Sequence, residues 1–143
     1  MEKPIIAVTM GDPAGIGPEI VAKSIADKAT FDSARCIIVG DKKVMEKAIE
    51  VVNVDLKVNV VDNPADGDYT YGVLNMIDLD NIDMSKFEYG EVNAMCGQAA
   101  FDYIKKSIEI TMDKQADAVA TTPINKESLH AAEVEFIGHT EIF

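Results

Sequence analysis

Short apolar segments alternate with amphipathic, helix-length segments along the first third of the chain. The segments Pro4–Thr9 (PIIAVT) and Arg35–Gly40 (RCIIVG) are apolar and end at turn residues, which is typical of strands buried in a parallel sheet. Between them, a helix is predicted from Ile16 to about Lys28. Its apolar residues recur at helical spacing: Ile16, Ile20, Val21 and Ile25. This alternation predicts an α/β fold with a mostly parallel sheet.

The alternation continues after the second strand. Asp41 is a suitable N-cap for a helix. In Leu56–Val61, apolar and polar residues alternate with a period of two, which predicts a third strand at an edge of the sheet. Further on, we predict one long helix over Val92–Met112, a short buried strand over Asp117–Thr121, and a short helix capped by Asn125. The apolar face of the helix after Asp41 is formed by Val44, Met45, Ala48, Val51 and Val52.

Acidic residues gather in the middle of the chain, between Asp62 and Glu91. This stretch holds eight acidic residues against Lys86 alone, and so carries −7 of a formal net charge of −12. One strand, Val73–Leu79, is predicted within it. We interpret the stretch as a solvated loop and hairpin on the surface. The alternative is a cation site, but the acidic residues lack the regular spacing of a calcium-binding loop.

The charge and composition exclude several classes of protein. A chain of 143 residues has the length of one domain, and its acidity argues against nucleic acid or anionic lipid as a partner. No apolar run approaches the ~20 residues of a membrane helix, and the first residues do not resemble a signal peptide. Cys36 and Cys96 fit no metal-binding spacing and are interpreted as reduced, buried thiols. We therefore expect a cytoplasmic protein.

The first candidate site is the glycine-rich segment Gly11–Glu19 (GDPAGIGPE), which follows a strand and opens a helix. Backbone N–H groups at a helix start favour an anion. The segment is not a dinucleotide-binding fingerprint, because Ile20 stands where a third glycine is required after Gly15 and Gly17. A purely structural strand-to-helix corner is the equally weighted alternative.

Two further segments carry polar groups that could meet a ligand. Thr121–Lys126 (TTPINK) places two hydroxyls, the amide of Asn125 and the ammonium of Lys126 at the end of a strand, where open α/β sheets bind ligands. A capped helix with a solvated lysine is the alternative. His139, between a glycine and a threonine, can hydrogen-bond or exchange a proton near neutral pH, although taken alone it would more often be a structural imidazole. His130 is the solvent-facing histidine, and the two histidines make no metal site.

Together, these motifs resemble the 4-hydroxythreonine-4-phosphate dehydrogenase family of pyridoxal phosphate biosynthesis. The resemblance rests on TMGDPAGIGPEI at the start, the Gly90–Ile104 helix region, TTPINKESL, and GHTEIF at the end, in that order. The opening turn is also similar to that of isocitrate and isopropylmalate dehydrogenases. The resemblance therefore implies their fold, three α/β/α layers around a mostly parallel sheet.

The resemblance also implies a reaction and a set of site residues. NAD oxidises the secondary alcohol of a small phosphorylated four-carbon hydroxy acid, here 4-phosphohydroxy-L-threonine, and the β-keto acid then loses CO₂ with the help of a divalent metal (Zn, Mg or Co). His139 and Thr140 match the family's substrate-binding pair. Gly15, Gly17, Asn125 and Lys126 match motifs that line the cleft. No residue is assigned a catalytic role.

Family chains continue well beyond the GHTE motif, and their three metal-binding histidines and most of the NAD site lie there. His139 is therefore not assigned as a metal ligand. We expect residues 1–143 to be the N-terminal portion of a longer two-domain enzyme that is a homodimer when complete, and to be inactive alone. The alternative substrates are D-threonate and D-erythronate 4-phosphate, of sugar-acid breakdown. An alternative of another class is a non-catalytic phosphate-binding module.

Overall fold

The computed structural model describes residues 3–87 and 94–122, which form a five-stranded sheet in the order β3-β4-β2-β1-β5. Every strand pair among these five is parallel. Along the chain the elements are β1 (Ile5–Thr9), α1 (Gly17–Ala26), α2 (Lys28–Ser33), β2 (Arg35–Gly40), α3 (Lys42–Val52), β3 (Lys57–Val60), β4 (Val73–Asp78), α4 (Ala94–Met112) and β5 (Ala118–Ala120).

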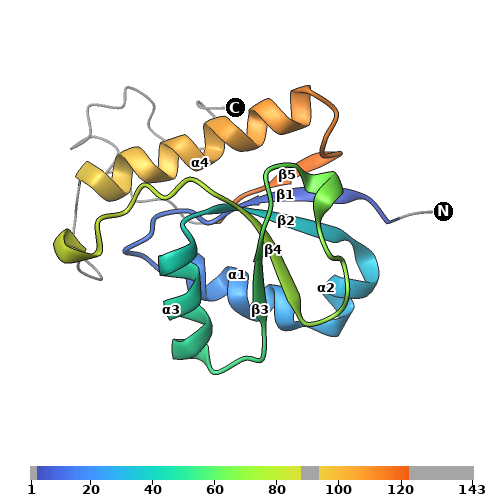
Figure 1. Ribbon diagram of the computed structural model, residues 1–143, viewed down its shortest axis with the longest axis horizontal. Helices are drawn as coiled ribbons and strands as arrows, with labels where there is room; N and C mark the ends of the chain where they lie inside the picture. Colours follow the sequence, from blue (N-terminus) through green and yellow to red (C-terminus); the bar gives the residue numbers. More distant parts are fainter. Residues whose placement is uncertain (1–2, 88–93, 123–143) are drawn as a thin grey trace.

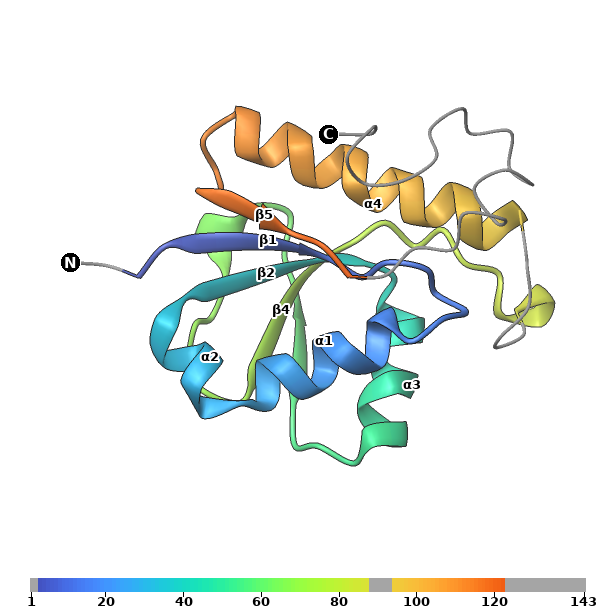
Figure 2. The ribbon, with the colours of Figure 1, turned by 180° about the vertical axis from the view of Figure 1, so that it is seen from behind.

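Helices cover both faces of this sheet. Figure 1 shows α1, α2 and α3 on one side and α4 alone on the other, and the reverse view in Figure 2 agrees. The predicted three-layer α/β/α architecture is therefore confirmed. The adjacent interior strands β2 and β4 carry much of the core, because side chains on both of their faces are buried. The largest fully buried side chains include Ile37, Ile38, Leu74, Met76, Tyr103 and Ile104.

The prediction of a surface hairpin in the acidic stretch is wrong. The expected strand exists as β4, but it lies between β2 and β3 and runs parallel to both, in register with Ile37–Gly40 on one side and Lys57–Val60 on the other. Leu74 and Met76 are fully buried. The apolar sequence of the strand, rather than the acidic loops around it, decided its position, since only a core strand buries both faces.

The helix predicted from Ile16 to about Lys28 is confirmed as α1, whereas the short helix that follows it, α2, was not predicted. α1 ends at Ala26, and the Asp27 carboxylate accepts a hydrogen bond from the N–H of Ala29 as the N-cap of α2. The apolar faces predicted for α1 and α3 are partly wrong. Ile16 and Ile20 are 60% and 38% exposed, and in α3 the side chain of Val51 is 57% exposed.

Other local predictions are confirmed. The Asp41 carboxylate accepts from the N–H of Val44 and caps α3, and β3 lies at the sheet edge. Neither cysteine forms a disulfide; Cys96 is buried, whereas Cys36 is only half-buried. The predicted long helix is described from Ala94 to Met112. The short helix predicted after Asn125 lies outside the described residues.

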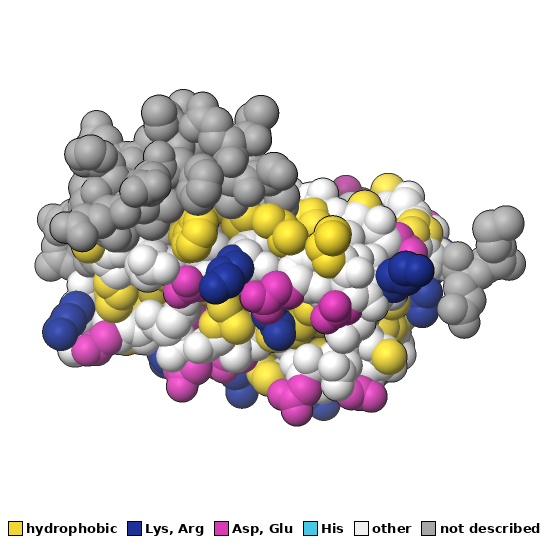
Figure 3. Space-filling model, turned by 90° about the horizontal axis from the view of Figure 1, so that it is seen from above, with side chains coloured by type: hydrophobic (Ala, Val, Ile, Leu, Met, Phe, Trp, Pro, Cys, Tyr) yellow, Lys and Arg dark blue, Asp and Glu magenta, His cyan; other side chains and the backbone are white. Residues whose placement is uncertain are grey.

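Charged side chains of both signs lie on the face of the molecule that carries α4 (Figure 3). On the α4 side, basic and acidic side chains lie next to one another among apolar ones in the described part of the surface (Figure 3). Within residues 3–87 and 94–122, no helix combines the length and the apolar character that crossing a bilayer requires.

Candidate active site

The strand order creates a topological switch point at the carboxyl end of β1. This strand pairs with β2 on one side and β5 on the other. The helices that lead to these two neighbours cover opposite faces of the sheet, α1 on one and α4 on the other (Figure 2). Open α/β sheets bind their ligands outside the carboxyl ends of strands at such a point. The segments that follow β1 and β5 are therefore the candidate active site.

A buried hydrogen bond joins these two segments. The Thr122 hydroxyl donates to the backbone carbonyl oxygen of Thr9 at 2.9 Å, and Thr122 is only 8% exposed. The parallel pairing of Val8 with Ala120 places the two segments at the same end of the sheet. The TMGDPAGIGPEI and TTPINK motifs, more than a hundred residues apart in the chain, thus meet through Thr9 and Thr122.

Gly17 begins α1 in contact with both segments. A Cβ atom on residue 17 would lie 2.3 Å from the carbonyl oxygen of Met10 and 2.9 Å from Oγ1 of Thr122, so the helix can approach the strand end only with glycine there. At Gly15, by contrast, a Cβ atom would lie 3.5 Å from its nearest neighbour, the carbonyl oxygen of Asp12. Gly17 is buried and Gly15 is half-buried. Of the two, Gly15 presents the more accessible backbone.

Asp12 closes the turn between β1 and α1. Its carboxylate accepts from the N–H of Ala14 at 2.9 Å, and its backbone carbonyl accepts from the N–H of Gly15 at 3.0 Å. The residue is 3% exposed. Burial raises the pKa of its carboxyl group, and the hydrogen bond from Ala14 partly opposes that rise. Sequence reasoning did not single out Asp12, although an aspartate before proline in a glycine-rich segment is a turn signal.

Two more buried groups border this turn. Oγ1 of Thr9 has no hydrogen-bond partner among the described residues, which is unusual for a buried hydroxyl. Cys96 lies close enough to Asp12 to be affected by its charge. Burial and that carboxylate raise the pKa of the Cys96 thiol to about 11. The thiol therefore stays protonated at neutral pH and is a poor nucleophile.

The carboxylates at the ends of β2 and β4 have structural roles. Asp41 accepts from the backbone N–H groups of Val44 and Ile82, at 3.2 and 3.1 Å. Asp78 accepts from the N–H of Lys42 at 3.0 Å. These bonds cap α3 and tie it to the loop after β4, so both carboxylates are occupied by backbone donors.

An apolar groove continues from the candidate site along the edge of β5. It has a volume of about 360 Å³ and runs between α1 and the sheet, where Ile6 and Val8 face Ile20 and Val21. Thr121 and Thr122 line the same groove. The exposed Ile20 side chain is thus part of a concave surface next to the turn rather than of the core.

The structure places only some of the residues predicted for the site. Gly15 and Gly17 lie in the turn described above, whereas four others fall outside the described residues: Asn125, Lys126, His139 and Thr140. Among residues 3–87 and 94–122, no group of three or more His, Cys, Asp or Glu side chains could hold a metal ion. The described part of the site therefore consists of backbone, hydroxyls and one buried carboxyl group.

Comparison with known proteins assigns the fold and motifs to a family. The profile of "Pyridoxal phosphate biosynthetic protein PdxA" matches residues 32–143. A protein from Fusobacterium nucleatum, named "Putative D-threonate 4-phosphate dehydrogenase", is 56% identical over 96% of this chain and 41% of its own length. A protein of the same name from Symbiobacterium thermophilum is 50% identical over 99% of this chain and 42% of its own length.

Comparison with solved structures leads to the same family. The crystal structure of a 4-hydroxythreonine-4-phosphate dehydrogenase from Burkholderia phymatum superposes with a TM-score of 0.94 at 36% identity, over 99% of this chain and 43% of that one. The chain spans about two fifths of the length of these relatives. By the family profile, the sequence identities and the shared fold, the chain belongs to the PdxA family, whose relatives compared above are named as dehydrogenases.

Proposed function

We propose that the full-length protein oxidises a small phosphorylated four-carbon hydroxy acid with NAD and then decarboxylates the product. A hydride passes from the alcohol carbon to NAD⁺, and the hydroxyl proton is released to give a β-keto acid. The carbon–carbon bond to the carboxylate then breaks to release CO₂, and the enolate that keeps the electron pair takes up a proton to give the ketone. The observation that carries this proposal is the junction of Thr9, Gly17 and Thr122, which brings two family motifs together at the switch point. Membership of a family of dehydrogenases supports the reaction class.

The residue roles are part of the proposal. His139 and Thr140 bind the substrate, while Gly15, Gly17, Asn125 and Lys126 line the cleft. We place the ligands of a divalent metal outside residues 1–143. When bound, the metal would polarise the hydroxyl and carboxylate oxygens of the substrate. We further propose that residues 1–143 belong to a longer two-domain protein that forms a homodimer.

The choice between two substrates is the next point to test. The relatives at 56% and 50% identity carry the D-threonate 4-phosphate name, whereas the structure at 36% carries the 4-hydroxythreonine name. Because the relatives with the higher identities carry the D-threonate name, we propose D-threonate 4-phosphate as the substrate rather than 4-phosphohydroxy-L-threonine. D-threonate 4-phosphate has a hydroxyl in place of the amine. We expect kcat/KM of the full-length protein to be at least about tenfold higher for D-threonate 4-phosphate, or ~1.4 kcal/mol in transition-state binding. A preference for 4-phosphohydroxy-L-threonine would reverse this choice and leave the reaction class intact.

Substitution of His139 tests the substrate-binding role. Removing a hydrogen bond to a charged substrate group costs about 1.5–3 kcal/mol, so His139→Ala in the full-length protein should lower kcat/KM by roughly 10- to 100-fold. Thr140→Val should cause a smaller loss, because it removes one neutral hydroxyl. Elemental analysis should find the metal content unchanged in both variants. Loss of the metal from His139→Ala, with substrate binding unaltered, would instead identify His139 as a ligand.

A further inference from the structure

The strand β5 is a weak anchor for the segment that follows it. It has three residues, Ala118–Ala120, and lies at the edge of the sheet beside β1 (Figure 2). Ala118 and Ala120 are exposed and Val119 is half-buried, so the strand buries little apolar surface. The last residue pair between the two strands joins Ala120 to Val8. Strand pairing therefore ends before Thr121, where the TTPINK motif begins.

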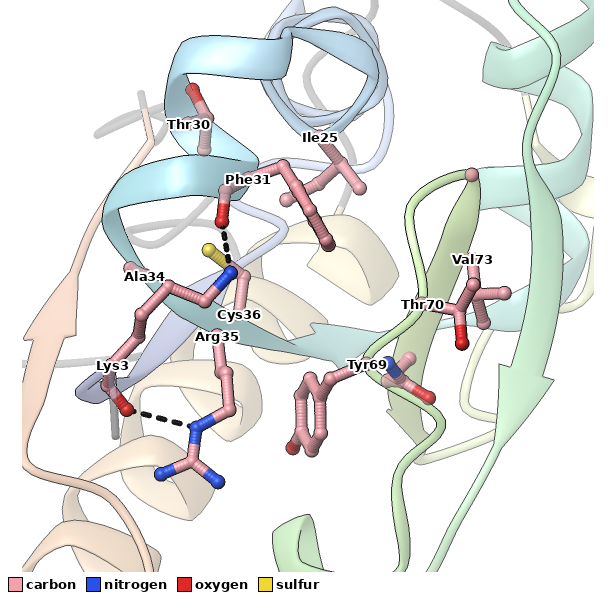
Figure 4. A pocket seen from close by; sticks show the side chains of 12 residues that line it. Lys3, Ile25, Thr30, Phe31, Ala34, Arg35, Cys36, Tyr69, Thr70 and Val73 are labelled. Carbon is pink, nitrogen blue, oxygen red and sulfur yellow. Dashed lines mark hydrogen bonds between the residues drawn. The ribbon is translucent and has the colours of Figure 1, made fainter. Parts of the chain in front are cut away.

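At their amino-terminal ends, β1 and β5 are attached by several hydrogen bonds. The N–H of Asp117 donates to the carbonyl oxygen of Ile5 at 2.8 Å, and the N–H of Ile5 donates to the Asp117 carboxylate at 2.9 Å. Nε of Arg35 in β2 donates to the carbonyl oxygen of Lys3 at 2.8 Å, within the pocket that Figure 4 shows. These bonds lie at the opposite end of the strands from the candidate active site.

At the carboxyl ends of the two strands, a single side chain makes the connection. The Thr122 hydroxyl donates to the carbonyl oxygen of Thr9 at 2.9 Å, and among the described residues this is the one side-chain hydrogen bond between the segments that follow β1 and β5. Gly17 packs against the same hydroxyl, since a Cβ atom on residue 17 would lie 2.9 Å from Oγ1 of Thr122. The hydroxyl therefore lies where the end of β1, the start of α1 and the segment after β5 meet.

The hydroxyl of Thr122 is not a donor that a ligand can use. A threonine hydroxyl has one O–H donor, and that of Thr122 is occupied by Thr9. The residue is also buried, whereas its neighbour Thr121 is exposed. Of the two hydroxyls that were expected to meet a ligand after β5, that of Thr121 is accessible and that of Thr122 holds the backbone in place.

We propose that Thr122 is a positioning residue for the oxidation proposed above. Its hydroxyl fixes the segment after β5 against the end of β1 and the start of α1, and so keeps the two motifs that border the cleft in one arrangement. This inference rests on the proposed function, which places the substrate in that cleft. Positioning has a large effect in such reactions, because a misplacement of ~1 Å can reduce the rate about 100-fold.

Removal of the hydroxyl in the full-length protein tests this role. Thr122→Val keeps the shape of the side chain, and we expect kcat/KM for the substrate that the wild type prefers to fall about tenfold. Thr122→Ser keeps the O–H donor and should stay within about twofold of the wild type. The matched control is Thr111→Val, near the end of α4 that leads to the start of β5. It deletes a hydroxyl that donates to the carbonyl oxygen of Ser107 at 2.8 Å.

A purely structural role for Thr122 gives a different result. Both valine variants lose a hydroxyl-to-carbonyl bond, so both should lower the midpoint of urea unfolding by similar amounts. A small loss of stability leaves nearly all molecules folded, and by itself it does not change kcat/KM. Unchanged kcat/KM in Thr122→Val, an equal loss of kcat/KM in Thr111→Val, or no recovery in Thr122→Ser would overturn the proposal. If Thr122→Val fails to fold, Thr122→Ala takes its place, with the same expected loss.

Hydrogen exchange separates this inference from the proposed reaction. If the wild-type full-length protein oxidises neither candidate substrate, the proposed function fails, and positioning is decided without turnover. Mass spectrometry should then find backbone amides of residues 15–17 and 118–121 exchanging at least about threefold faster in Thr122→Val than in the wild type, but not in Thr122→Ser. Equal exchange in all three proteins would show that the hydroxyl does not hold these segments together.

Discussion

Gly17→Ala is expected to destabilise the folded chain by about 3 kcal/mol, the upper end of the usual range for an overpacked site. The new Cβ atom would lie 2.3 Å from the carbonyl oxygen of Met10, a distance that requires the backbone to move. Met10 cannot move easily, because its N–H donates to the carbonyl oxygen of Val39 at 2.9 Å. The same Cβ would press on Oγ1 of Thr122 and disturb its bond to Thr9.

Gly15→Ala is the matched control for this substitution. It makes the same chemical change two residues away, but its Cβ would meet nothing closer than 3.5 Å, so its effect should stay within about 0.5 kcal/mol. Urea unfolding of both variants measures the difference as a change in midpoint at constant m-value. Similar destabilisation by the two substitutions would show that the close approach of α1 to the end of β1 is not what requires glycine at position 17.

The 143-residue chain by itself is expected to produce no NADH from NAD and either candidate substrate. Hydride transfer requires cofactor and substrate to be held about 3–3.5 Å apart in a defined orientation. The chain spans about two fifths of the length of its relatives, and we place most of the NAD site and the metal ligands in the remaining part. A folded chain that binds substrate without orienting it against NAD has no route to the transition state.

This expectation is checked by following NADH absorbance with Mg²⁺ or Zn²⁺ present. The full-length gene product serves as the positive control, and circular dichroism confirms that the shorter chain is folded. Turnover comparable with that of the full-length protein would contradict the expectation.

Sequencing the DNA beyond the codon of Phe143 tests the alternative that the protein is a non-catalytic phosphate-binding module. A stop codon there favours the module, whereas an open reading frame with histidine-bearing motifs favours the enzyme.

Local features of the fold were predictable from the sequence, and long-range ones were not. The capping role of Asp41 and the bounds of β2 follow from neighbouring residues. The position of β4 depends on its pairing with β2, which lies more than thirty residues away in the chain. The acidic residues around β4 led instead to the prediction of a surface hairpin. The end of the first helix was predicted to within two residues, but the short helix α2, which Asp27 caps, was not predicted.

In the candidate site too, the local features were predictable from the sequence and the long-range contacts were not. The glycine-rich turn after β1 was predicted from its composition and position, but its contact with Thr122 required the pairing of β1 and β5. Spacing could not distinguish Gly17, which packs a helix against a strand end, from Gly15, whose surroundings have room for a side chain. Burial of Asp12 is likewise a property of the assembled sheet.

The insertion of β4 between β2 and β3 also constrains the order of events during folding. In the described sheet β3 has one hydrogen-bonding neighbour, β4, which follows it in the chain. An edge strand without its neighbour cannot form a ladder, so Lys57–Val60 gains no sheet hydrogen bonds until Val73–Asp78 is available to pair with it. Closing such non-local parallel pairs is slow, because loop entropy is lost before contacts form. β3 therefore joins the described sheet only through β4, and during synthesis on the ribosome it stays unpaired until the strand that follows it has been made.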